Sequence, residues 1–445
     1  MTETFDLIIK GGIAMLPQGR TQTDIGVREG KITTFGDLDA TQAGNVIDAT
    51  GLHVLPGMID TQVHFREPGG EHKEDLESGT RAAVMGGITG VFEMPNTNPL
   101  TTSAEALTDK ITRAAARAWC NHAFYMGGNA ANADQMAEIE RTPGCCGVKV
   151  FMGSSTGNLL VPDDESLRAV LSHGVRRVAV HAEDEDRLIE RKRVAEESGE
   201  VHSHPDWRDD ETAIKATRRL IAIARETGRR VHLLHVTTAD EMAMIRDHKD
   251  LISVEVTPQH LSLAAPDCYD KHGPFAQMNP PIRNAQHQGA LWQALEDGTV
   301  DVIGSDHSPH SAEEKQLPYP NSPSGMPGVQ TLIPLMLNHV AQGRLTLERF
   351  VDLMCSGPQR LFGIMGKGRI AVGYDADFTL VDLGLQRDIT DDWIESKCGW
   401  TTFAGTSVTG WPRATIIAGN PVMMEDELIG TAAGQPMRFF ECEYA

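Results

Sequence analysis

Hydrophobic positions in the middle of the chain fall into short apolar runs, separated by longer segments of helical character. The runs are rich in β-branched residues and cover residues 54–60, 88–94, 122–127, 147–152, 177–181, 231–236, 252–257 and 300–305. The helix-like segments include residues 102–118, 184–197, 211–227 and 286–296. Apolar strands that alternate with helices indicate a parallel sheet covered on both faces. Eight such strands predict an α/β fold, a closed (β/α)8 barrel of the TIM type.

The two ends of the chain show a different pattern. Residues 6–10, 23–27 and 31–35 are β-rich runs separated by glycine turns, and residues 377–382 and 414–420 are similar. We therefore expect residues 1–53 and 366–445 to form one small composite β-sandwich domain. Residues 54–365 are expected to form the barrel.

The composition narrows the range of partners. Forty Lys and Arg residues stand against 62 Asp and Glu residues, which gives a formal net charge of −22. Such an acidic protein is poorly suited to nucleic acid or to an anionic membrane. We expect a small-molecule substrate and neither of those partners. An anionic substrate would need local positive charge in its site. The oligomeric state stays open, with a homo-oligomer as one option.

Features of the N-terminus and of the cysteines predict a cytoplasmic protein. The first residues contain no basic region followed by a long apolar run, so we expect neither a signal peptide nor a transmembrane segment. The seven cysteines are odd in number and include no Cys-x-x-Cys pair. Reduced thiols in the cytoplasm are the plain interpretation.

Five polar residues stand at or near the ends of predicted barrel strands, and these are His64, Lys149, His181, His235 and Asp306. The carboxyl ends of barrel strands meet on one face, so the five side chains are expected to converge. A single His at a strand end is usually structural, but the joint set predicts a metal site, since imidazole and carboxylate suit zinc and similar ions. An ammonium inside an apolar strand is costly and would repel a cation. Carbamylation of Lys149 by carbon dioxide would convert it into a bridging carboxylate.

The motifs around these residues resemble those of the amidohydrolase superfamily and, within it, the dihydroorotases. They are His-Phe-Arg-Glu-Pro-Gly from His64, Met-Pro-Asn-Thr from Met94, Lys-Val-Phe-Met-Gly-Ser-Ser-Thr-Gly-Asn from Lys149, His-Ala-Glu-Asp from His181 and Asp-His-Ser-Pro-His from Asp306. The resemblance extends from residues 51–60 to residues 368–377. It implies one or two zinc ions bridged by carboxylated Lys149. One ion would lie on His181 and His235, and the other on His64 and Asp306.

The same resemblance implies a set of substrate residues. Arg66, Asn96 and His310 match positions that bind the dihydroorotate carboxylate, while Asn279 and Gly325 match positions that meet the pyrimidine ring. A guanidinium offers a planar pair of donors to a carboxylate, although Arg66 could instead form a surface or supporting ion pair. Allantoinases and hydantoinases act on rings without this carboxylate, and the allantoinase pattern has Asn in place of Arg66. Arg66 therefore favours a dihydroorotase.

Two positions depart from the common pattern. Most of the superfamily has His-x-His after the first strand, whereas this chain has Gln62-Val-His64, a version that resembles one bacterial branch of dihydroorotases. A neutral amide carbonyl is a weaker zinc ligand than imidazole, so whether Gln62 binds metal is left open. Gln259 also stands where relatives often carry His. His260 beside it is either a supporting residue of the site or a structural one.

The implied reaction is the reversible ring closure of N-carbamoyl-L-aspartate to (S)-dihydroorotate in de novo pyrimidine biosynthesis. In the hydrolytic direction, a hydroxide activated by the metal attacks the ring amide, and Asp306 carries the proton to the departing nitrogen. Residues 308–328, rich in Pro, Ser and Gly, are expected to form a lid. Two alternatives stay open, namely a cyclic amidase of the allantoinase or hydantoinase type, and an inactive scaffold that stabilises aspartate transcarbamoylase.

Overall fold

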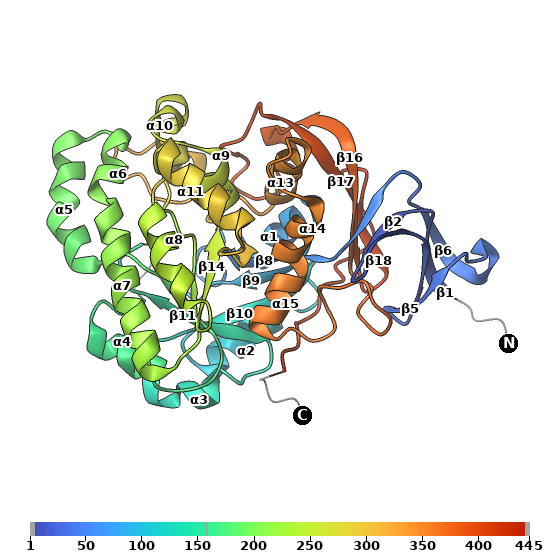
Figure 1. The fold of residues 1–445 in the computed structure, drawn as a ribbon, viewed down its shortest axis with the longest axis horizontal. Helices are drawn as coiled ribbons and strands as arrows, with labels where there is room; N and C mark the ends of the chain where they lie inside the picture. Colours follow the sequence, from blue (N-terminus) through green and yellow to red (C-terminus); the bar gives the residue numbers. More distant parts are fainter. Residues whose placement is uncertain (1–4, 156–158, 441–445) are drawn as a thin grey trace.

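Eight parallel strands form the centre of the computed structural model, which describes residues 5–155 and 159–440 (Figure 1). They are β8 (Met58–Val63), β9 (Ile88–Glu93), β10 (Asn121–Gly127), β11 (Cys145–Phe151), β12 (Val178–His181), β13 (Val231–Leu233), β14 (Ile252–Val256) and β15 (Val302–Ile303). The strands are hydrogen-bonded in chain order from β8 to β15. A parallel bridge between Val63 and His307 joins the last residue of β8 to the chain just beyond β15. The sheet thus closes almost completely, and the predicted (β/α)8 barrel is confirmed.

The first predicted strand is wrong in one respect, because residues 54–60 do not form a single strand. Strand β7 (His53–Pro56) pairs with β2 (Ile13–Leu16) and β16 (Phe378–Asp388), outside the barrel. The chain then turns at Gly57 and enters β8. A side chain at Gly57 would collide with Thr89 and Asp377. The apolar pattern is alike on both sides of this glycine, so it does not reveal the change of sheet.

Helices surround the barrel, and most begin with a side chain that caps the first turn. The helices are α1 (Leu76–Met85), α2 (Ala104–Ala114), α3 (Met136–Ile139), α4 (Asp164–Leu171), α5 (Glu185–Ser198), α6 (His204–Trp207), α7 (Asp210–Thr227), α8 (Ala239–Ile245), α9 (Pro258–Ser262), α10 (Asp267–His272), α11 (Ala285–Glu296), α12 (Ala312–Lys315), α13 (Leu332–Ala341), α14 (Leu347–Val351) and α15 (Gly357–Phe362), with a π-helix at Asp352–Ser356. Asp184 and Asp209 accept main-chain hydrogen bonds at the starts of α5 and α7. The four predicted helices are present, although α2 ends at Ala114 and not at residue 118.

Both ends of the chain contribute to a pair of sheets beside the barrel (Figure 1). One sheet has the order β5-β4-β1-β6 and the other has the order β19-β18-β17-β16-β7-β2-β3. The strands not yet defined are β1 (Phe5–Lys10), β3 (Gly19–Gln22), β4 (Asp24–Arg28), β5 (Lys31–Gly36), β6 (Ala43–Asp48), β17 (Ser407–Ile417), β18 (Asn420–Met424) and β19 (Glu427–Leu428). Met437 and Phe439 near the C-terminus pack in the barrel core. The proposed division into residues 1–53 with 366–445 and residues 54–365 stays a prediction.

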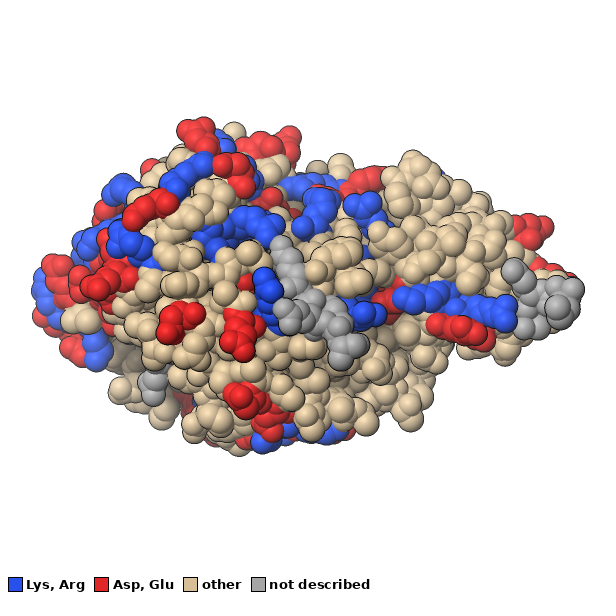
Figure 2. All heavy atoms as spheres, turned by 90° about the horizontal axis from the view of Figure 1, so that it is seen from below, with Lys and Arg blue, Asp and Glu red and all other residues tan. Residues whose placement is uncertain are grey.

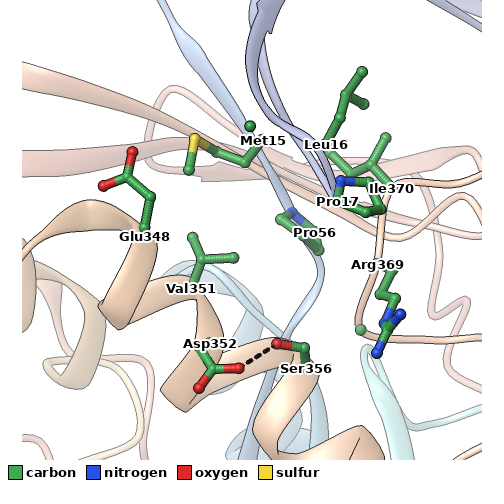
Figure 3. Close-up of a pocket in the computed structure, with 12 residues that line it drawn as sticks. Met15, Leu16, Pro17, Pro56, Glu348, Val351, Asp352, Ser356, Arg369 and Ile370 are labelled. Carbon is green, nitrogen blue, oxygen red and sulfur yellow. Dashed lines mark hydrogen bonds between the residues drawn. The ribbon is translucent and has the colours of Figure 1, made fainter.

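A cavity of about 240 Å³ lies in the seam between these sheets and the barrel (Figure 3). Met15, Pro56, Val351 and Ile370 contribute apolar side chains to its wall. The nearby Asp352 carboxylate accepts a hydrogen bond from Ser356 (2.7 Å). Because Pro56 directly precedes the start of β8, this cavity lies at the amino ends of the barrel strands, away from the face where barrel enzymes carry out chemistry.

On the face shown in Figure 2, acidic and basic side chains lie intermixed over the surface. The excess of acidic residues is thus broken up by Lys and Arg on this face. Among the helices of residues 5–155 and 159–440, none has the length and apolar character required to cross a membrane.

Candidate active site

A cavity at the carboxyl ends of the barrel strands contains most of the residues singled out from the sequence. This inner cavity is lined by Gln62, His64, Asn96, Lys149, Phe151, Ser155, His181, His235, Asn279, Asp306, Ser308, Ser324 and Gly325. All the predicted metal and substrate residues line it except Arg66 and His310, which lie directly behind Ser308. The convergence expected from the strand ends is therefore present.

One side of the inner cavity, here called the Lys149 side, consists of Lys149, His181 and His235. Lys149 is 1% exposed, and its amine nitrogen Nζ has no hydrogen-bond partner among the described residues. Burial lowers the pKa of this amine to about 7, so a large fraction is neutral near physiological pH. His181 Nδ1 lies 3.1 Å from His235 Nε2. Burial also lowers the pKa of both imidazoles, which keeps their nitrogen lone pairs available.

A buried carboxylate orients His181 from behind. Glu183 Oε2 lies 2.8 Å from His181 Nε2, and Arg208 binds the same carboxylate. Burial alone would raise the pKa of Glu183, but Arg208 and His181 hold that pKa below its ordinary range. Glu183 thereby fixes the ring so that Nδ1 faces the cavity. Sequence reasoning gave Glu183 no role, although its place two residues after His181 was a signal.

The opposite side, here called the Asp306 side, consists of Gln62, His64 and Asp306. Gln62 Nε2 donates to Asp306 Oδ1 (2.9 Å), and His64 Nε2 lies 3.3 Å from the same oxygen. His64 Nδ1 lies 2.9 Å from Asn96 Oδ1. Gln62 and His64 therefore contact the Asp306 carboxylate from two directions, and Asn96 holds the His64 ring in place.

The backbone is strained where the chemistry converges. His235 has φ +38°, Arg66 has φ +63° and Asp306 has φ +45°, all in the left-handed region that non-glycine residues rarely adopt. Such outliers cluster at functional sites, where surrounding structure holds them in place. His235 and Asp306, which were predicted from strand ends, and Arg66, which the resemblance implied, thus share an uncommon conformation that aims their side chains.

Two buried acids lie beneath the inner cavity, and sequence reasoning missed both. Asp60 Oδ1 accepts hydrogen bonds from the amides of Gln62 (3.1 Å) and Ser305 (2.9 Å), which ties β8 to the chain beyond β15. Glu255 on β14 accepts a hydrogen bond from Thr61 (2.6 Å). Burial raises the pKa of Asp60 to about 7 and that of Glu255 to about 8. Asp60 thus contacts both β8 and the chain beyond β15, and Glu255 joins β14 to β8.

Arg66 is buried without a carboxylate partner. Its Nη2 donates to Ser308 Oγ (2.6 Å) and lies 3.4 Å from His310 Nε2, while Nε donates to the Pro309 carbonyl (3.3 Å). Among the described residues no Asp or Glu forms an ion pair with it, and it is 8% exposed. Burial lowers the pKa of Arg66 to about 10, which leaves it charged at neutral pH. This arrangement differs from a surface or supporting ion pair.

A wider outer vestibule of about 600 Å³ leads toward the inner cavity. Ser155, Asn279 and Ser324 line both spaces, so these residues form the wall between them. Lys73, Lys192 and Arg208 lie among the vestibule residues. The approach to the site therefore carries basic side chains on an otherwise acidic protein.

The remaining glutamine and histidine are structural supports. Gln259 Nε2 donates to the Ser305 carbonyl (2.7 Å). His260 is buried, with Nδ1 2.8 Å from Thr257 Oγ1 and Nε2 3.1 Å from the Pro280 carbonyl. Neither lines the inner cavity. Within the part of the chain that the structure describes, no three His, Cys, Asp or Glu side chains are grouped so as to hold a metal ion by themselves.

Comparison with known proteins agrees with the fold. The model of the Amidohydrolase family matches residues 53–422. A dihydroorotase from Halobacterium salinarum is 36% identical over 92% of this chain and 95% of that protein. A dihydroorotase from Methanosarcina mazei is 34% identical over 91% of both chains. An allantoinase from Deinococcus radiodurans is 33% identical over 98% of this chain and 99% of that protein.

A solved structure is similar over almost the whole length. The L-hydantoinase (dihydropyrimidinase) from Arthrobacter aurescens superposes with a TM-score of 0.92 at 29% identity, covering 98% of this chain and all of that one. The extent of the family match and the long alignments with curated relatives lead to one conclusion. The chain belongs to the amidohydrolase family and is a hydrolase of the kind that acts on cyclic amides.

Proposed function

We propose that this protein is a dihydroorotase, which catalyses the reversible cyclisation of N-carbamoyl-L-aspartate to (S)-dihydroorotate in de novo pyrimidine biosynthesis. Overall similarity does not decide this by itself, because dihydroorotases and an allantoinase match the chain at 34% and 33% identity. One difference between the substrates is the carboxylate, which the dihydroorotate ring carries and the allantoin ring lacks. The residue that would bind this carboxylate therefore distinguishes a dihydroorotase from an allantoinase.

The single supporting observation is the environment of Arg66. A guanidinium that is 8% exposed and has no carboxylate partner is costly to bury, unless a ligand supplies the anion. His310 beside it has a pKa lowered by burial and by the neighbouring Arg66, so its ring is neutral. Its Nδ1 lies 3.1 Å from Lys73 Nζ and its Nε2 lies 3.1 Å from the Ser324 carbonyl, so a substrate carboxylate would replace one of these two contacts. We assign Arg66, Asn96 and His310 to the substrate carboxylate, and Asn279 and Gly325 to the pyrimidine ring.

We further propose that the cavity holds zinc, as one or two ions per chain. The side chains fit such ions. His181 Nδ1 and His235 Nε2 are 3.1 Å apart, close to the spacing of about 3.3 Å that two imidazole ligands of one tetrahedral zinc ion have. An amine is no ligand for this ion while protonated. A Lys149 carboxylated by carbon dioxide would supply the missing third ligand, and its buried, partly neutral amine favours that reaction.

His64 and Asp306 would hold a second ion on the other side, with Gln62 as a further ligand left open. When bound, the metal would polarise the ring amide and lower the pKa of water. The protein supplies proton transfer through Asp306, which takes the proton of the attacking water and passes it to the ring nitrogen as the amide bond breaks. In the synthetic direction the same transfers run in reverse. Arg66 holds the ring so that attack is effectively unimolecular.

Steady-state assays with dihydroorotate, allantoin and dihydrouracil test the proposal. Purified protein reconstituted with zinc is expected to turn over dihydroorotate with a kcat/KM at least about a hundredfold above that for the other two rings. Turnover of allantoin or dihydrouracil alone would overturn the assignment. That result would favour the allantoinase or hydantoinase alternative, for which the Deinococcus allantoinase and the Arthrobacter L-hydantoinase are the relevant relatives.

The same assays distinguish an active enzyme from the inactive scaffold. Protein that binds zinc but turns over none of the three rings would support a scaffold for aspartate transcarbamoylase. The cytoplasmic location and a homo-oligomeric state stay predictions from the sequence.

A further inference from the structure

A buried lysine lies inside the lid segment and donates hydrogen bonds to main-chain oxygens. Lys315 ends α12, within residues 308–328, and is 0% exposed. Its Nζ donates to the carbonyls of Gln277 (3.2 Å), Pro323 (2.8 Å) and Gly325 (3.0 Å). An ammonium has three N–H donors, so the three carbonyls match its hydrogen-bonding capacity.

This lysine has no acidic partner among the residues that the structure describes. Burial lowers the pKa of Lys315 to about 7, while the carbonyl oxygens favour the charged form. The indole of Trp400, whose ring centre is 6.0 Å from Nζ, lies over the same group. Burying an ammonium without an acidic partner costs free energy of folding, and a methionine of similar size would fill the space at a lower cost in free energy. We therefore expect the function of the ammonium to lie in fixing the three carbonyls that it binds.

Gln277 strengthens the same connection from the other direction. Its carbonyl accepts a hydrogen bond from the Gly325 amide (2.9 Å), and its Nε2 donates to the Ser322 carbonyl (3.1 Å) and to Ser324 Oγ (3.0 Å). Ser322 Oγ in turn donates to Gln277 Oε1 (2.8 Å). We call Lys315 and Gln277 together the lid clasp. The clasp ties residues 322–325 to the chain segment that leads into Asn279.

The lid clasp lies next to the wall between the inner cavity and the outer vestibule. Ser324 and Asn279 line both the inner cavity and the outer vestibule, and Gly325 lines the inner cavity. Gly325 approaches Ser308 so closely that a Cβ would collide with its carbonyl. A small shift of residues 323–325 would therefore be transmitted directly to the cavity wall.

We propose that Lys315 is a positioning residue for substrate binding. Its ammonium fixes the carbonyls of Pro323 and Gly325 and so holds the lid against the Gln277–Asn279 segment. It touches neither substrate nor reacting atoms. The inference rests on the proposed function only in assuming that the substrate ring meets the Ser324–Gly325 wall.

The test compares Lys315→Met and Gln277→Ala with the wild-type holoenzyme. Loss of the clasp is expected to raise KM for dihydroorotate by about tenfold, because the wall is misplaced, while kcat changes less than about threefold. Hydrogen exchange is expected to accelerate in peptides covering residues 322–328 and to stay unchanged in the barrel strands. If Lys315→Met does not fold, Lys315→Gln tests the same role, because its neutral amide can donate to two of the three carbonyls but carries no charge.

Lys249→Met is the matched control, since Lys249 binds the Thr299 carbonyl (2.7 Å) and Asp301 far from the lid. It should lower thermal stability with no change in KM or in lid exchange. Unchanged exchange and KM in both clasp variants would overturn the inference, as would equal effects in Lys249→Met. Hydrogen exchange needs no substrate. If the wild type turned over allantoin only, the proposed function would fail, whereas the exchange data would still decide the role of Lys315.

Discussion

The two sides of the inner cavity differ in what their polar atoms bind. On the Asp306 side, Gln62 and His64 converge on one carboxylate oxygen, at 2.9 and 3.3 Å. On the Lys149 side, Lys149 Nζ is buried without a hydrogen-bond partner among the described residues, and so is Gln62 Oε1 on the Asp306 side. The Asp306 side thus leaves a neutral amide oxygen without a partner, whereas the Lys149 side leaves an ionisable amine without one.

The difference indicates where a ligand is needed most. A buried polar atom without a partner costs about 1–3 kcal/mol, and a fold retains such a cost where another molecule relieves it. On the Asp306 side, the Gln62 amide must turn its nitrogen toward the carboxylate, since an oxygen there would be repelled. The Lys149 side is thus suited to tight metal binding, and the Asp306 side to proton transfer. Four substitutions test this comparison.

The largest effect is expected from Lys149→Met. Without a Lys149 carboxylate the metal on that side loses a ligand, so kcat/KM should fall at least about a thousandfold and metal content should drop. The metal-free variant should nevertheless melt at a higher temperature than metal-free wild type, because an apolar side chain replaces an unpaired buried amine. Metal analysis, steady-state kinetics and calorimetry check these results.

Lys192→Met is the control for this variant, because Lys192 lies in the outer vestibule and pairs with Glu196 (3.2 Å). It should keep full metal content and most of the activity. A Lys149→Met protein with normal metal content and rate would remove the contrast between the two sides.

Asp306→Asn should abolish most turnover while sparing the structure. The Asn oxygen can still accept from Gln62, but the side chain no longer takes a proton, so kcat should fall about a hundred- to a thousandfold. Metal content should change little. Asp60→Asn is the matched control, since this carboxyl is buried nearby but does not line the cavity. Equal losses in both variants would mean that Asp306 acts through structure and not as the proton carrier.

Arg66→Met addresses the substrate side of the comparison. Hydrogen bonds to a charged group contribute about 1.5–3 kcal/mol, so KM for dihydroorotate should rise about ten- to a hundredfold with metal content unchanged. Lys192→Met removes a vestibule cation that is already paired with Glu196 (3.2 Å) and should change KM far less. An unchanged KM in Arg66→Met would contradict the carboxylate assignment and favour an uncharged ring as substrate.

The sequence predicted the barrel and the convergence of its strand-end residues, because apolar runs that end in His or Asp are local signals. It did not reveal Glu183, whose partner Arg208 comes from a later segment, or Asp60, which binds the Ser305 amide across the barrel closure. Lys315 follows two glutamates and has the pattern of a solvent-exposed helix end. Its burial depends on carbonyls at Gln277 and Gly325, which only the folded chain brings together.

The smallest effect is expected from Gln62→His. The Gln62 amide nitrogen donates to Asp306, so of the three side chains on the Asp306 side only His64 offers an imidazole. A histidine would offer a stronger ligand, and affinity for a second ion should rise about tenfold or more, while kcat changes little. Competition with a chromophoric chelator measures both affinities. Gln259→His is the matched control, because Gln259 binds the Ser305 carbonyl behind the wall, and its affinities should equal those of the wild type. If Gln62→His binds a second ion no more tightly than Gln259→His, the asymmetry of the cavity does not lie in Gln62.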